Sequence, residues 1–169
     1  MAGGDTTFEL KALAPDSIAK ALQKVERYRL LNEPAEAESI CRDVLRADPG
    51  NPRALVMLLL TLTDQFGRGV GVNEAREIVG RLDGEYERAY YEGIVCERQG
   101  KALLRGPAAG SEVGSYGWLR EAMRAYERAE SLRPAGNDDA ILRWNACARI
   151  LRDRKLGPRS EDEVELPIE

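Results

Sequence analysis

Apolar residues recur at the three- and four-residue spacing of an amphipathic helix along most of this chain. Ile18, Leu22, Val25 and Leu31 illustrate the spacing. Prolines, glycines and asparagines interrupt the pattern, and proline stops a helix because it lacks the amide proton that the next turn needs. No segment alternates apolar and polar residues as a half-buried strand does. The sequence therefore predicts an all-α fold.

The interruptions divide the chain into seven predicted helices. They cover residues 18–31, 34–47, 52–65, 73–82, 85–99, 118–132 and 138–155, and an extension of the fifth helix to residue 104 is left open. Asp16, Asn51 and Asn73 are predicted N-caps, because their short polar side chains accept hydrogen bonds from exposed amides. A glycine-rich loop is predicted over residues 106–117. We interpret residues 1–16 as a lead-in, 17–155 as the helical domain and 156–169 as an acidic tail that we expect to be flexible.

Charge and hydropathy exclude two classes of partner. The formal net charge is −4, with 25 basic and 29 acidic residues interleaved along the chain, so a nucleic acid partner is not expected. The longest apolar stretch, residues 54–62, is far shorter than the roughly 20 residues that cross a bilayer, so no membrane insertion is expected. The first residues lack the pattern of a signal peptide, and three widely spaced cysteines are typical of a reducing compartment. We expect a cytoplasmic protein.

The chain contains no histidine, which removes histidine-dependent nucleophilic catalysis, histidine bases and histidine metal sites. The glycines of residues 67–71 follow a helix and not a strand, and no Gly-Lys-Ser/Thr comes after them, so they do not predict a nucleotide loop. We expect no enzymatic activity, no cofactor and no metal.

Two segments carry the pattern of a repeated second helix. In AEAESICRDVLRADPGNP, residues 35–52, Ala37 and Pro49 fall on the small-residue and closing-proline positions, and REAMRAYERAESLRP, residues 120–134, repeats the match with Ala122 and Pro134. Residues 89–101 resemble a first helix, with Gly93 at its small-residue position. Over about residues 17–153 the chain thus resembles the tetratricopeptide repeat family. The resemblance implies a right-handed solenoid of three antiparallel helix pairs plus a closing helix. An ordinary helical bundle is the alternative.

The resemblance also implies a function and a surface. Members of this family bind an extended or helical peptide in a concave groove that is lined by their first helices. The positions that correspond to this groove are Leu22, Glu26, Val56, Leu60, Thr63, Tyr90, Ile94, Glu97, Ile141 and Asn145. Members that clamp a terminal carboxylate carry Lys and Asn at positions where this chain has Leu22, Glu26 and Val56, so that ligand is not expected.

We therefore expect a non-enzymatic adaptor or scaffold whose apolar groove binds a peptide or protein segment. The alternative is a dedicated chaperone for a secreted or membrane-associated client, and self-association is left open. A further hypothesis concerns the tail. In an extended conformation Val164, Leu166 and Ile168 share one side, so the tail itself could dock in the groove.

Overall fold

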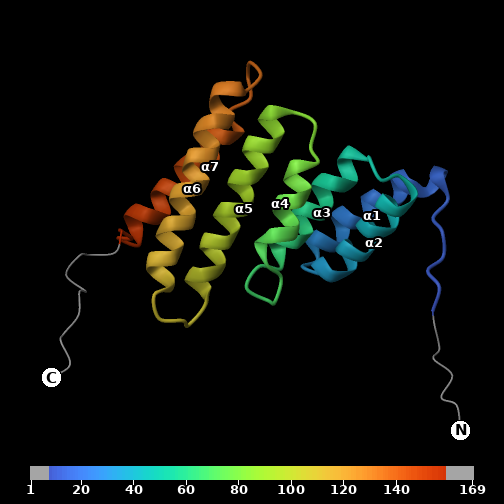
Figure 1. Cartoon of the computed structure of the whole chain (residues 1–169), viewed down its shortest axis with the longest axis horizontal. Helices are drawn as coiled ribbons and strands as arrows, with labels where there is room; N and C mark the ends of the chain where they lie inside the picture. Colours follow the sequence, from blue (N-terminus) through green and yellow to red (C-terminus); the bar gives the residue numbers. More distant parts are fainter. Residues whose placement is uncertain (1–7, 159–169) are drawn as a thin grey trace, which may run out of the picture. The chain divides into compact units, whose positions relative to one another are not determined.

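The computed structural model describes residues 8–158, and within them the protein consists of helices (Figure 1). The sheet-like contact found there is a single isolated bridge between Phe66 and Val70. Consecutive helices pack antiparallel. The elements are a 3-10 helix η1 (Pro15–Ser17) and the α-helices α1 (Ile18–Leu30), α2 (Pro34–Ala47), α3 (Pro52–Asp64), α4 (Val72–Gly80), α5 (Glu85–Arg105), α6 (Ser111–Leu132) and α7 (Asp139–Asp153). The predicted all-α class is confirmed.

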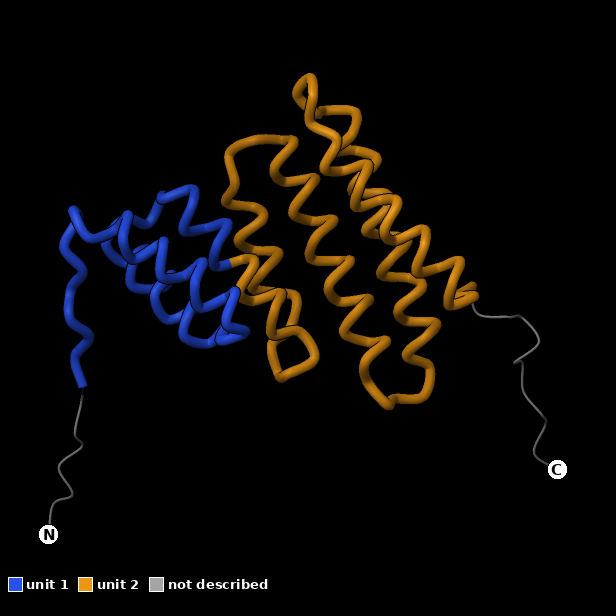
Figure 2. The backbone as a smooth tube through the Cα atoms, turned by 180° about the vertical axis from the view of Figure 1, so that it is seen from behind, with its two compact units in different colours: residues 1–58 blue, residues 59–169 orange. Residues whose placement is uncertain are grey.

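The chain divides into two compact units, Met1–Leu58 and Leu59–Glu169 (Figure 2). The boundary between them falls within α3, inside the segment 17–155 that the sequence predicts as the helical domain. The first unit contains α1, α2 and the beginning of α3. The second contains the rest of α3 and the helices α4 to α7.

In the first unit, α1 packs against α2 around a small apolar core of Ala21, Leu22, Val44 and Ala54. Asn51 caps α3 as predicted, because its Oδ1 accepts a hydrogen bond of 2.9 Å from the amide of Ala54. The other two cap predictions are wrong. Asp16 lies inside the 3-10 turn that Pro15 opens, and α4 begins at Val72, one residue before Asn73.

In the second unit, the predicted loop over residues 106–117 is wrong. The α6 helix begins at Ser111, so the connection from α5 spans only residues 106–110. The added first turns of α6 lie against the end of α5. Ser115 Oγ donates a hydrogen bond of 2.9 Å to the Gly100 carbonyl oxygen, and a Cβ at Gly114 would lie 3.3 Å from Leu103. These contacts outweigh the low helix propensity of the glycines.

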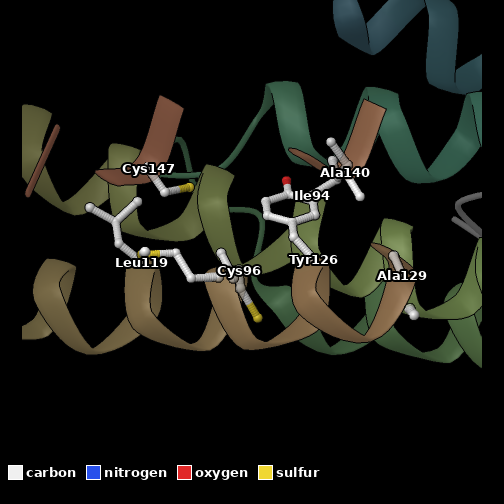
Figure 3. Close-up of a cluster of buried hydrophobic side chains, with 10 residues drawn as sticks. Ile94, Cys96, Leu119, Tyr126, Ala129, Ala140 and Cys147 are labelled. Carbon is white, nitrogen blue, oxygen red and sulfur yellow. The ribbon is translucent and has the colours of Figure 1, made fainter. Parts of the chain in front are cut away.

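The predicted small-residue positions allow close helix contacts. Ala37 and Ala122 are fully buried. The closest approach is at Gly93 of α5, where a Cβ would lie only 2.4 Å from the ring of Tyr126 on α6. Side chains from α5, α6 and α7 meet around that ring (Figure 3). A glycine is required at this position because the ring occupies the space of a side chain.

Candidate binding site

Four of the ten predicted groove residues are buried, so they are not open to a peptide as the resemblance implied. Leu22 is 3% exposed and belongs to the core of the first unit, while Ile94 is 2% exposed within the core between α5, α6 and α7. Thr63 is 1% exposed, and its hydroxyl donates to the Leu60 carbonyl oxygen at 2.8 Å. Glu97 is fully buried. Tertiary packing turns these positions inward, which the pattern of one helix does not reveal.

The remaining predicted residues keep some exposure. Glu26 is exposed and pairs with Arg53 across 2.5 Å. Val56, Leu60, Tyr90, Ile141 and Asn145 are half-buried. Leu22, Glu26 and Val56 belong to the first unit and the other seven to the second. Five of those seven lie on α5 and α7, namely Tyr90, Ile94, Glu97, Ile141 and Asn145.

Glu97 is the centre of a buried polar cluster in the second unit. Its Oε1 accepts hydrogen bonds from Lys101 Nζ, one turn further along α5, and from Arg143 NH1 of α7 at 3.3 Å. Its Oε2 accepts a hydrogen bond of 2.6 Å from the Tyr126 hydroxyl. Both carboxylate oxygens therefore have partners, as a charged group without contact with water requires.

The pKa values of the neighbouring groups follow from this burial. Burial and the adjacent charge of Glu97 raise the pKa of Tyr126, so this tyrosine stays neutral and donates its proton to the carboxylate. Burial by itself would lower the pKa of Arg143, but the charge of Glu97 and a hydrogen bond to Tyr90 outweigh it, and the pKa is raised. The cluster thus holds one negative and two positive charges.

A group of tyrosines continues from this cluster along α5. Tyr86 and Tyr90 stack with ring centroids 5.8 Å apart, and Tyr90 also contacts Tyr126 at 5.9 Å. The Tyr86 hydroxyl accepts a hydrogen bond of 3.0 Å from Asn137 Nδ2, in the connection between α6 and α7. At 3.6 residues per turn, Tyr86, Tyr90, Glu97 and Lys101 lie within about 60° of one another around α5.

We call Tyr86, Tyr90, Lys101 and Arg143 the tyrosine–cation strip. All four side chains keep some exposure, and Lys101 and Arg143 are 32% and 36% exposed. Sequence reasoning found only Tyr90 among them. Tyr86 and Lys101 share the α5 face that it considered, so the same periodicity could have found them. The periodicity of α5 could not have found Arg143, because this residue lies 46 positions from Glu97 and on another helix.

A second polar group lies where α4, α5 and α6 meet. Arg76 lies 5.0 Å above the Trp118 ring and pairs with Glu92 at 3.0 Å, and it also donates to the sulfur of Cys96 at 3.7 Å. Burial raises the pKa of the Cys96 thiol to about 12, so the sulfur is not a ready nucleophile. These contacts join three helices and explain the partial burial of Trp118.

Other kinds of site receive no support from the residues that the structure describes. Among residues 8–158, no three side chains of the types His, Cys, Asp and Glu gather closely enough to hold a metal ion. Within the same range, none of the helices combines the length and apolar content needed to span a bilayer. The hypothesis that Val164, Leu166 and Ile168 dock in a groove lies outside the described residues.

Comparison with known proteins gives no family for this chain. No protein-family model matches it, and neither a curated protein nor a solved structure does. The class that the fold itself defines is an all-α protein of antiparallel helices.

Proposed function

We propose that this chain is a non-enzymatic protein-interaction module that binds a peptide or protein segment through the tyrosine–cation strip. Its helix pairs would form a tetratricopeptide-like solenoid, as the repeated second-helix pattern suggests. The apolar groove inferred from sequence is revised, since Ile94 and Glu97 are buried while the four aromatic and basic side chains of the strip keep some exposure.

The observation that carries the proposal is that the side chains of the strip are partly exposed to solvent and are also held in place by neighbouring residues. Tyrosine and arginine are enriched among the residues that contribute most to protein interfaces. Arg143 and Lys101 are bonded to Glu97, and the ring of Tyr90 packs against those of Tyr86 and Tyr126, so these side chains are already ordered before a partner binds. A partner therefore loses less conformational entropy in ordering them.

The test is selection of binders from a random dodecapeptide library displayed on phage, with the full chain immobilised. The parent should enrich peptides, and the double variant Tyr86→Ala with Arg143→Gln should lose them. The matched control, Tyr28→Ala with Arg149→Gln, removes a half-buried tyrosine and an exposed arginine from elsewhere and should retain them. The proposal fails if the parent enriches nothing, or if the strip variant binds the same peptides as the parent.

A further inference from the structure

The charges around Glu97 do not balance. Glu97 carries one negative charge, and Lys101 and Arg143 bring two positive charges to the same oxygen. Tyr126 and Cys147 are neutral neighbours, because burial raises both of their pKa values, that of Cys147 to about 12. The cluster therefore keeps one uncompensated positive charge.

The two cations also have hydrogen-bonding capacity left. An ammonium group has three N–H donors and a guanidinium group five. Lys101 uses a donor on Glu97, and Arg143 uses donors on Glu97 and Tyr90. About a third of each of these two side chains meets solvent, so other donors can face a ligand.

The arrangement favours a carboxylate with an aromatic or aliphatic neighbour. The planar fork of arginine matches a carboxylate in a two-point contact, and a lysine beside it adds a further positive charge. The half-buried rings of Tyr86 and Tyr90, which precede Lys101 on α5, offer apolar contact to the next residues of a bound segment. At the Tyr86 end of the strip, burial raises the pKa of Tyr86, and the nearby charges of Asp139 and Glu87 raise it further. The strip therefore becomes less positive with distance from Lys101.

The net charge of the whole chain argues against nonspecific binding of acidic peptides. At a formal net charge of −4, the protein as a whole repels acidic peptides and polyanions. Selective binding of an acidic segment would therefore require a local receptor and could not come from general attraction.

We propose that Lys101 and Arg143, held by the buried Glu97, bind the side-chain carboxylates of an acidic segment of a partner protein. This inference rests on the proposed function and names the chemistry of its ligand. The acidic end of the segment lies at Lys101 and Arg143, and its apolar residues lie toward Tyr86.

The experiment uses the peptides that the full chain selects from the phage library, where no peptide has a free C-terminal carboxylate. Peptides from the parent should be enriched in Asp and Glu, and those from Lys101→Gln and Arg143→Gln should not. Arg149→Gln is the matched control, since Arg149 is an exposed arginine of the same helix. It should select the same acidic peptides as the parent.

The affinity of one selected peptide is then compared with that of its twin in which Gln and Asn replace Glu and Asp. Each single variant should weaken the acidic peptide about tenfold, as expected for a hydrogen bond between charged groups. The neutral twin should bind parent and variants equally, which excludes a general loss of folding. Added salt should weaken the acidic peptide more in the parent than in either variant.

The outcomes separate this inference from the proposed function. If the parent selects peptides without enrichment of acids, or if its acidic and neutral twins bind alike, the carboxylate receptor is wrong while the binding module stands. If the parent selects no peptide, both proposals are wrong.

Discussion

Replacement of Gly93 by alanine tests the closest helix contact in the second unit. A Cβ at this position would lie 2.4, 2.6 and 2.9 Å from three ring atoms of Tyr126. The ring has little freedom to move away, since Tyr126 is fully buried and its hydroxyl is bonded to Glu97 at 2.6 Å. An added methyl group must therefore push the two helices apart.

The magnitude follows from two opposing effects. Overpacking of a buried contact costs about 1–3 kcal/mol, and the fixed ring places Gly93 near the upper end of that range. Alanine in place of glycine within a helix recovers about 1 kcal/mol. We expect Gly93→Ala to lower the free energy of unfolding by about 2 kcal/mol. Gly117→Ala is the matched control, because it lies within α6 with no atom within 4 Å of its added Cβ, and it should raise that free energy by about 1 kcal/mol.

The assay is urea unfolding followed by tryptophan fluorescence. Both tryptophans, Trp118 and Trp144, belong to the second unit, so the signal reports that unit even when the first unfolds separately. In a Tyr126→Leu background the penalty of Gly93→Ala should shrink, because the ring atoms are gone. The reasoning is refuted if Gly93→Ala stabilises the second unit as much as Gly117→Ala does.

Two further predictions concern buried ionisable groups. Tyr126→Phe should lower the free energy of unfolding by about 1–3 kcal/mol in the same assay, because Glu97 Oε2 loses its donor. The control is Tyr116→Phe, at a half-buried tyrosine of α6, and it should change that free energy little. Equal effects of the two substitutions would contradict the role of the buried bond. The thiols of Cys41, Cys96 and Cys147 have pKa values raised from 9.0 to about 12 by burial, so between these values the unfolded chain loses thiol protons that the folded chain keeps. Their contribution is therefore fully present below pH 9 and is lost as the pH rises toward 12. The urea concentration at the unfolding midpoint should fall between pH 9 and about pH 12, and it should fall less steeply for Cys147→Ala than for the parent. If the two plots of midpoint against pH run parallel, Cys147 does not contribute.

The helices themselves were readable from the sequence. The signals that define them act within a turn or two, and Pro34–Ala47 begins and ends where the proline and the Asp-Pro break predict. The cap at Asn51 follows from the same local chemistry. By contrast, the start of α6 was missed, because Gly114 and Ser115 are held in the helix by Leu103 and Gly100, which belong to another helix.

The tertiary structure decided which helix faces are buried and which meet solvent. The spacing along α5 put Tyr90, Ile94 and Glu97 on one face, and a charged residue on such a face is expected to meet water. Folding instead buried Glu97, because Tyr126 and Arg143 arrive from 29 and 46 positions further along the chain to satisfy its oxygens. Local periodicity fixes which residues share a face. Lys101 comes from the same helix as Glu97, but only the packing of distant helices supplies Tyr126 and Arg143, the other partners that make the buried charge stable.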